Sequence, residues 1–211
     1  MIQIFLLREG PAWFGCASHD EELVATSVAV SRERVLDDLE RSLPSGIPYR
    51  VMSKPTAFAA EKLRLLAALE AGDEREKRFE LSRAYVREPL RSVLLVASTI
   101  PLGFVSTYGN VASRAGTEAR VVGQAMGGNI LYPIVPCHRV VGADLSLVGY
   151  GRRQDMDALC AKLGRLRRET RGFTEETFVP GSSLRVYPVE WAIAKALKDG
   201  VETARQLSLF G

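Results

Sequence analysis

A charged stretch, Gly72 to Arg78, divides the 211-residue chain into two parts with different hydrophobic patterns. In the first part, three short apolar runs separated by turn-like residues predict strands at Ile2 to Leu7, Trp13 to Ala17 and Leu23 to Val30. Two amphipathic helices should follow, the first capped by Ser31 and the second covering Thr56 to Glu70. Residues 1–80 are therefore expected to form a small α/β domain.

The second part has a mostly helical pattern. Apolar spacing and capping residues predict helices from Pro89 through Ala97, Tyr108 to Ala115, about Glu118 to Gly127, Met156 to Glu169 and Pro188 to Leu197. The second and third of these, joined at Gly116, form a candidate helix-turn-helix. Residues 130–135 read as an extended apolar segment and residues 170–187 as irregular. The predicted fold class is α/β (α+β), with a mostly helical domain that contains the helix-turn-helix and Cys137 over 81–172 and a C-terminal extension over 173–211.

Composition narrows the functional classes only slightly. The net charge of +3 makes the chain mildly basic, so charge alone neither supports nor excludes a nucleic-acid partner. The three cysteines, Cys16, Cys137 and Cys160, are far apart and predict neither a disulfide framework nor a metal site. No apolar stretch approaches the roughly 18 residues of a membrane span. We therefore expect a cytoplasmic protein with reduced thiols, no metal and no membrane partner.

The sharpest chemical feature is Cys137 followed by His138. Only the thiolate form of cysteine is a good nucleophile, and a nearby imidazole can take the thiol proton directly or through a water molecule. Adjacent side chains on an extended strand point in opposite directions, but Pro136 makes a bent backbone plausible here. The pair taken alone also fits a buried thiol beside a surface histidine.

The segments around this pair carry a more specific pattern. The runs IPLGFVSTYGNVA (100–112), ARVVGQA (119–125) and PCHRVV (136–141), together with Asn129, agree in order, spacing and residue type with one family. In these features the chain resembles the O6-alkylguanine-DNA alkyltransferases. The resemblance implies direct, irreversible transfer of an alkyl group from O6 of a damaged guanine to Cys137. Such a reaction needs no cofactor and consumes the protein after one turnover.

The resemblance also implies a role for two further residues in the chemistry. His138 matches the family base, which acts through a bound water molecule. Glu169 matches a carboxylate that orients this histidine, because Lys162 to Glu169 fits the family pattern Lys-x-x-Leu-Leu-x-x-Glu with Arg165 in place of the first Leu. A carboxylate fixes an imidazole tautomer and stabilises its charged form. The alternative for Glu169 is a solvated side chain at a basic helix end.

Access to a guanine inside stacked duplex DNA requires base flipping. By the resemblance, Tyr108 crowds the target phosphate and aids rotation of the nucleotide, and Arg120 enters the stack to fill the gap. The small residues Ala119 and Gly123 would let the recognition helix enter the narrow minor groove. The implied partner is double-stranded DNA containing O6-alkylguanine, bound by a monomer.

Other positions match residues that support the active site in this family. By the resemblance, Asn129 would brace the turn before the cysteine, and the backbones of Val140, Gly149 and Tyr150 would belong to the wall that reads the guanine edge. The chain departs from the family where Arg152 and Arg153 replace glycine-rich sequence, which could narrow the pocket or clasp a phosphate. Glu118 is a second departure, since the family usually has Ala or Pro at this position. A carboxylate beside phosphates weakens DNA binding unless it points away.

The C-terminal residues Gln206, Leu209 and Phe210 resemble the short peptides that dock onto DNA sliding clamps. A free C-terminus is a suitable place for such a peptide. The alternative is a hydrophobic tail that packs on its own domain.

Three other functions are alternatives to alkyl transfer, and each predicts a different sequence feature or reaction product. A lesion sensor of the same fold would lack the cysteine, so Cys137 argues against it. A transcription regulator would carry base-reading polar side chains on its recognition helix, where this chain has small and apolar ones. A Cys-His hydrolase would turn over repeatedly and release a hydrolysed product.

Overall fold

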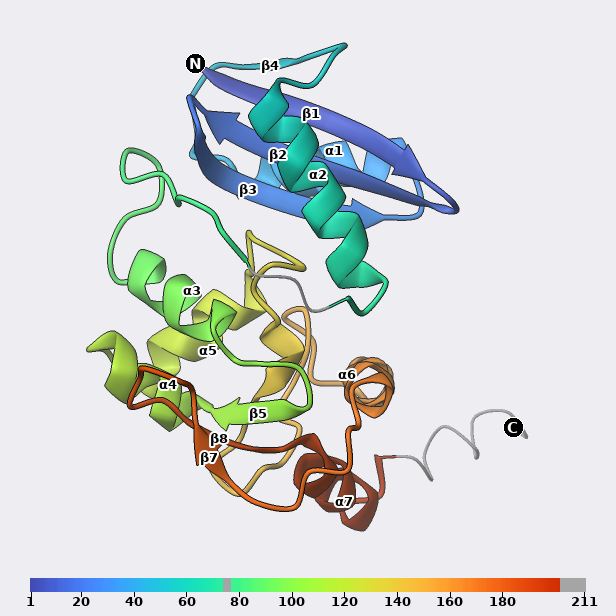
Figure 1. Ribbon diagram of the computed structural model, residues 1–211, viewed down its shortest axis with the longest axis vertical. Coiled ribbons are helices and arrows are strands. Elements are labelled where there is room, and N and C mark those ends of the chain that lie inside the picture. The colour runs from blue at the N-terminus through green and yellow to red at the C-terminus, as the bar shows by residue number, and fades with distance from the viewer. Residues whose placement is uncertain (74–76, 202–211) are drawn as a thin grey trace. The chain divides into compact units, whose positions relative to one another are not determined.

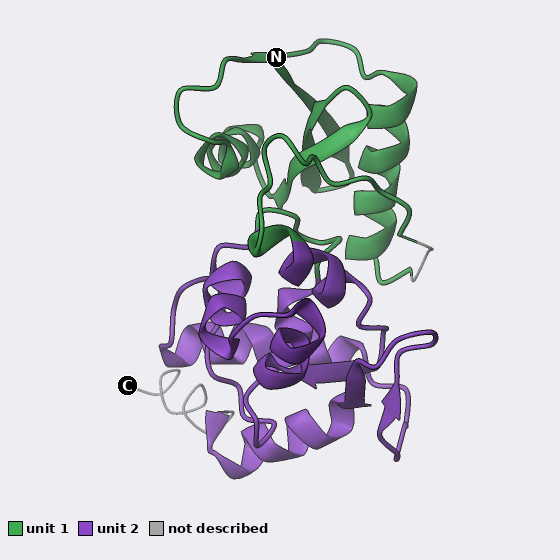
Figure 2. Cartoon of the chain, turned by 90° about the vertical axis from the view of Figure 1, so that its left-hand side faces the viewer, with its two compact units in different colours: residues 1–91, 130–135 green, residues 92–129, 136–211 purple. Residues whose placement is uncertain are grey.

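The structure is a computed structural model that describes residues 1–73 and 77–201 (Figure 1). The chain forms two compact units (Figure 2). The first unit contains residues 1–91 and 130–135, and the second contains the remaining described residues. The units therefore divide the chain differently from the predicted boundaries. Residues 81–91 and 130–135 belong with the N-terminal sheet, and the extension after residue 172 is part of the second unit.

The first unit is built on a four-stranded sheet in the order β3-β2-β1-β4. Its strands are β1 (Ile2–Glu9), β2 (Ala12–His19), β3 (Glu22–Ala29) and β4 (Tyr49–Val51). The pairs β1–β2 and β2–β3 are antiparallel, whereas β4 runs parallel to β1. The three predicted strands are confirmed, while β4 is an edge strand of three residues that the sequence pattern did not predict.

Two helices cover opposite faces of this sheet, with α2 in front of it and α1 behind it in Figure 1. The helix α1 (Arg32–Ser42) begins where Ser31 accepts a hydrogen bond from the Arg34 amide. The helix α2 (Ala57–Glu70) is capped in the same way by Thr56. A side-chain cap satisfies one of the amides that a first helical turn leaves unpaired, so both predicted starts have a physical cause.

The remaining elements follow in chain order, and several of them are only a few residues long. They are α3 (Leu90–Ser98), β5 (Phe104–Thr107), α4 (Tyr108–Ala115), α5 (Ala119–Gly127), the 3-10 turn η1 (Cys137–Arg139), β6 (Val140–Val141), α6 (Met156–Arg168), β7 (Thr177–Phe178), β8 (Arg185–Pro188) and α7 (Val189–Lys198). All five predicted helices are present. Gly116, at φ +67°, ends α4 in the left-handed conformation that glycine adopts without strain.

The second unit also contains a small sheet, in the order β6-β5-β8-β7. The prediction that residues 170–187 are irregular was therefore wrong, because β7 and β8 form an antiparallel hairpin there. The prediction of an extended segment at 130–135 was also wrong. Only Leu131 makes a bridge, to Thr26, and the Val135 amide then closes a turn by donating to the Leu131 carbonyl.

The sheet of the second unit brings two distant parts of the sequence together. Strands β5 and β6 are parallel, with Thr107 opposite Val141. The start of α4 and the turn η1 therefore lie beside each other, although about thirty residues separate them in the sequence. The core beneath them is formed by buried residues of the sheet, α6 and α7: Val105, Val141, Leu163, Leu166, Val189, Ala192 and Ala196.

No helix in the described part of the chain is long and apolar enough to cross a membrane. The residues proposed for sliding-clamp binding, Gln206, Leu209 and Phe210, lie outside the described residues.

Candidate active site

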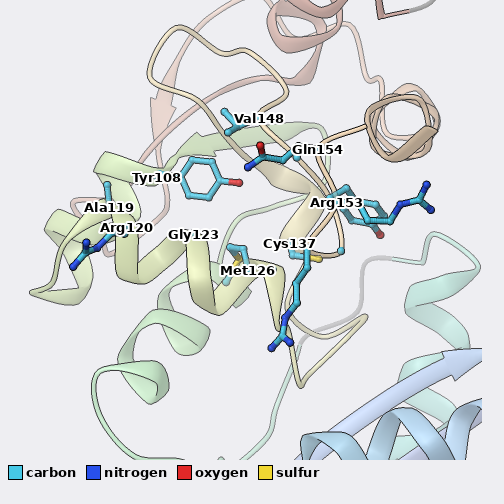
Figure 3. Close-up of a pocket in the computed structure, with 14 residues that line it drawn as sticks. Tyr108, Ala119, Arg120, Gly123, Met126, Cys137, Val148, Arg153 and Gln154 are labelled. Carbon is cyan, nitrogen blue, oxygen red and sulfur yellow. The ribbon is translucent and has the colours of Figure 1, made fainter. Parts of the chain in front are cut away.

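A pocket of about 430 Å³ opens in the second unit, within the size range of small-molecule sites (Figure 3). Its walls come from the start of α4, one face of α5, the turn η1 and the loop before α6. The lining residues are Tyr108, Ala119, Arg120, Gly123, Met126, Gly127, Cys137 and residues 148–154. Seven of the predicted site residues, Tyr150 among them, thus line one cavity.

Cys137 sits at the first position of η1, where the backbone bends. The Arg139 amide donates to the Pro136 carbonyl at 2.8 Å, which closes the turn. The bend separates the side chains of Cys137 and His138, so that Cys137 reaches the pocket while His138 lies behind it. Only 8% of Cys137 is exposed to solvent. The irregular backbone expected after Pro136 is therefore present, without a hydrogen bond between the two side chains.

A buried carboxylate holds His138 from behind. His138 Nε2 lies 2.7 Å from Glu169 Oε1, and both side chains are about nine-tenths buried. Because an ionised carboxylate only accepts hydrogen bonds, Nε2 carries the proton and Nδ1 keeps its lone pair. His138 Nδ1 is buried and has no hydrogen-bond partner among the described protein atoms. The basic nitrogen is thus the one that Glu169 does not use.

Arg139 completes this cluster. Its Nε donates to Glu169 Oε2 at 2.8 Å, and a second guanidinium nitrogen donates to Oε1 at 3.1 Å. A third contact, to the Ile100 carbonyl at 2.7 Å, anchors the arginine to the turn before β5. Burial raises the pKa of Glu169, but His138 and Arg139 outweigh this effect and hold its pKa at about 2. Glu169 is therefore ionised at neutral pH.

The surroundings of Cys137 have opposing effects on the pKa of its thiol. Burial raises the pKa of Cys137, and this is the largest effect. A hydrogen bond with the Asn129 side chain and the positive charges of Lys162 and Arg165 act in the other direction. Burial also lowers the pKa of His138, more than Glu169 raises it. The resting site therefore combines a protonated thiol with a neutral imidazole, the two forms from which a proton transfer can start.

Lys162 is a site residue that sequence reasoning missed, since it entered only as part of the pattern that located Glu169. It is fully buried, and its ammonium group donates to the Val140 carbonyl at 2.7 Å and the Gly149 carbonyl at 3.1 Å. Burial lowers its pKa to about 8, while the nearby Cys137 raises it. Val140 does not line the pocket. Through its two hydrogen bonds, Lys162 connects β6 to the loop that lines the pocket.

The predicted DNA-contacting residues form one side of the pocket. Figure 3 shows the Tyr108 hydroxyl directed into the cavity and Arg120 extending away from Cys137. Ala119 and Gly123 lie on the same face of α5, and a side chain added at Gly123 would meet open space. Glu118, the residue before α5, is exposed and makes no capping hydrogen bond.

The two arginines of the pocket loop behave differently. The Arg152 side chain lies against the end of α5, where a Cβ added at Gly128 would be 2.7 Å from its guanidinium. Arg153 instead forms hydrogen bonds of 2.7 and 3.0 Å with Asp155 and points away from the pocket in Figure 3. Of the two, only Arg152 is placed to narrow the cavity along α5.

Acidification is expected to destabilise the protein through Glu169. The ordinary pKa of this carboxyl is 4.5, against about 2 in the folded protein. Its stabilising effect is complete above about pH 4.5 and is lost as the pH falls toward 2, and it corresponds to about 3 kcal/mol. Protonation of His138, whose pKa is also lowered, acts in the same direction.

Urea unfolding of the wild type and Glu169→Gln at pH 7 and pH 3 measures this effect. The difference in unfolding free energy between the two proteins should be smaller at pH 3. An equal difference at both pH values would contradict the assignment of the low pKa to Glu169.

Comparisons with known proteins agree with this geometry. Residues 89–171 match the family model described as the DNA-binding domain of 6-O-methylguanine DNA methyltransferase. The methylated-DNA–protein-cysteine methyltransferase of Mycolicibacterium paratuberculosis is 40% identical over 136 residues, which cover 61% of this chain and 81% of that protein. The protein of the same name from Mycobacterium leprae is 35% identical, with 64% and 83% covered.

Comparison with solved structures also finds similarity to O6-methylguanine methyltransferases. The O6-methylguanine methyltransferase of Mycobacterium tuberculosis superimposes with a TM-score of 0.54 and 25% identity, over 82% of this chain and 97% of that chain. A Mycobacterium tuberculosis structure in complex with DNA matches with a TM-score of 0.51 and 29% identity, over 71% and 84% of the two chains.

Proposed function

Because this chain belongs to the methylated-DNA–protein-cysteine methyltransferase family, we propose that Cys137 is the residue that accepts the alkyl group. The chain is an enzyme of DNA repair that acts by alkyl transfer from damaged DNA to the protein. The observation that carries the assignment of Cys137 is its place in the pocket wall, in front of the buried His138–Glu169 pair.

The proposed reaction begins with proton transfer from Cys137. A water molecule between the thiol and His138 Nδ1 would take the thiol proton and pass one to the imidazole, while Glu169 stabilises the resulting imidazolium. The thiolate then attacks the methyl carbon. The new S–C bond forms as the C–O6 bond breaks, and the electron pair of the broken bond stays on guanine. Guanine then takes up one proton from solvent as the His138 imidazolium releases one, so the thiol proton is accounted for. The thioether is not hydrolysed, so each protein reacts once.

The geometry supports a mode of DNA binding that exposes the target base. We infer that α4 and α5 act as a helix-turn-helix, with the small residues Ala119 and Gly123 entering the minor groove. Tyr108 would crowd the target phosphate and Arg120 would fill the space left in the stack. The protein would act as a monomer in the cytoplasm and contact mainly the DNA backbone, as a search for lesions in any sequence requires.

Intact-protein mass spectrometry tests this function. The protein is mixed with an oligonucleotide that carries one O6-methylguanine. Its mass is then measured, and peptide mapping locates any added group. We expect a gain of one methyl group per protein, located on Cys137. Tight binding without a mass change would instead indicate a lesion sensor, and repeated turnover would indicate a hydrolase.

Bulky adducts are expected to react more slowly than methyl. Arg152 occupies space beside Gly127 and Gly128 at the end of α5, where a benzyl group attached to O6 would need room. Wild type should therefore transfer benzyl more slowly, and Arg152→Ala should raise the benzyl-to-methyl rate ratio roughly tenfold, the size of a steric effect in an apolar pocket. Single-turnover rates on the two substrates give this ratio.

Arg153→Ala is the matched control, because Arg153 has the same charge and points away from the cavity. Its rate ratio should equal that of the wild type. Equal or faster benzyl transfer by the wild type would contradict the narrowing of the pocket.

A separate proposal concerns the C-terminal tail and is supported by sequence alone. Gln206, Leu209 and Phe210 would dock onto a DNA sliding clamp, with Gln in a polar niche and the two apolar side chains in a hydrophobic pocket. Deleting residues 205–211 should abolish clamp binding. Failure of the intact protein to bind a clamp would dispose of the proposal.

A further inference from the structure

We propose that strand β8 of the C-terminal extension positions Tyr108 for rotation of the target nucleotide. This inference rests on the function proposed for Tyr108 above. The extension lies beyond residues 89–171, the part of the chain that matches the family's DNA-binding domain. The contribution that we propose therefore comes from residues outside the matched domain.

The first observation is the place of β8 in the sheet. It pairs with β5, with Phe104 opposite Pro188 and Val105 opposite Tyr187, and Figure 1 shows the two strands side by side. The Val189 amide adds a hydrogen bond of 2.9 Å to the Gly103 carbonyl. Strand β5 ends at Thr107, directly before Tyr108, so whatever fixes β5 also fixes the start of α4.

The second observation is a shared acceptor, the carbonyl oxygen of Arg185 in β8. The Ser106 hydroxyl donates to it at 2.7 Å, and the Asn110 side-chain amide lies 3.4 Å from it. The same amide lies 3.4 Å from the Tyr187 hydroxyl. Ser106 and Asn110 stand on either side of Thr107 and Tyr108, so β8 contacts both the strand before Tyr108 and the first turn of the helix that it begins.

These contacts can fix the direction of the Tyr108 side chain because β5 passes directly into α4 at a capped helix start. Thr107 caps α4 by accepting from the Asn110 amide, and Tyr108 is the first helical residue. The direction of its ring therefore depends on the angle between β5 and α4. Ser106 is fully buried, so its hydrogen bond to Arg185 is protected from competing water. Errors of about 1 Å in a positioning group can cost roughly 100-fold in rate.

Removing the extension would not test this role, since Val186, Val189 and Ala192 are buried in the core and their loss would unfold the unit. A side chain on α4 is the better target. Asn110→Ala removes the contacts to β8, keeps the backbone amide that Thr107 caps and introduces a good helix former. Ser106→Ala is the second variant, and Ser113→Ala is the control, an exposed serine of the same helix.

The experiment compares methyl transfer from duplex and single-stranded oligonucleotides, because only the duplex requires rotation of the base out of a stacked pair. Asn110→Ala should be roughly threefold to tenfold slower than the wild type on the duplex and equal to it on the single strand. Ser106→Ala should share this pattern, Ser113→Ala should match the wild type on both, and Tyr108→Ala should show a larger duplex-specific loss.

Wild-type rates on the duplex for both Asn110→Ala and Ser106→Ala would overturn the inference, as would equal slowing on both substrates. If Tyr108→Ala has no duplex-specific loss, its role in rotation fails and the inference fails with it. Methylation of Cys137 by the wild type, measured by mass, would still stand in that case, so the two failures can be told apart.

Discussion

Replacing Cys137 by alanine is expected to abolish methyl transfer completely while leaving recognition of the damaged DNA intact. The thiol is the only group in the pocket that can form the thioether, and no neighbouring lining residue is a comparable nucleophile. Alanine fits the space of the buried side chain, and we expect the pocket walls formed by α4 and α5 to keep their positions in this variant. Mass spectrometry after incubation should show no gain, and a binding titration should give an affinity for lesion DNA close to that of the wild type.

The other cysteines provide controls for this variant. Cys160 is half-buried and donates to the Val201 carbonyl at 3.2 Å, and Cys16 is fully buried with a pKa raised to about 12. Cys16→Ala and Cys160→Ala should each still gain one methyl group. Residual methylation of Cys137→Ala would mean that another residue accepts the group.

The second large effect is expected from Glu169→Gln, which should slow methyl transfer roughly 100-fold. A neutral amide no longer stabilises the imidazolium of His138, and it can present an N–H to Nε2 and so favour the wrong tautomer. The substitution also removes the negative charge of Glu169 from beside the buried guanidinium of Arg139. We expect a loss of about 3 kcal/mol in unfolding free energy, the lower end for a broken buried ion pair. Single-turnover rates and urea unfolding measure the two effects.

Glu190→Gln is a matched control for the loss of a carboxylate. Glu190 accepts hydrogen bonds from the Arg171 and Gly172 amides at 3.0 and 2.7 Å and has no contact with His138. This variant should keep the wild-type rate. If it slows transfer as much as Glu169→Gln, general loss of stability rather than support of His138 explains both results.

The sequence predicts those parts of the fold that short stretches of residues determine by themselves. The three strands of the first sheet follow from apolar runs between turns, and the helices start at side-chain caps such as Ser31 and Thr107. Strands β4, β6 and β7 have two or three residues and show no periodicity to detect. They exist because a neighbouring strand offers hydrogen bonds, which is information from tertiary structure.

The candidate site likewise contains residues that can be recognised in the sequence and residues that cannot. The Cys137–His138 pair can be seen in the sequence, but Glu169 is 31 residues from His138 and could be assigned only through a family pattern. Lys162 could not be predicted as a buried residue, since lysine is almost never fully buried without partners. Its partners are the backbone carbonyls of Val140 and Gly149. Every residue has a backbone carbonyl, so the sequence carries no signal that identifies these two as partners.

The return of residues 130–135 to the first unit affects how the protein is made. Thr26 donates its backbone amide to the Ile130 carbonyl at 2.8 Å and its hydroxyl to the Tyr132 carbonyl at 2.8 Å, and Tyr132 bonds to Glu70. A nascent chain that has reached residue 91 lacks these acceptors, so the N-terminal unit is finished only after residue 135 has left the ribosome. Cys137 emerges two residues later, and the completed sheet unit and the reactive thiol therefore arrive at nearly the same moment of synthesis.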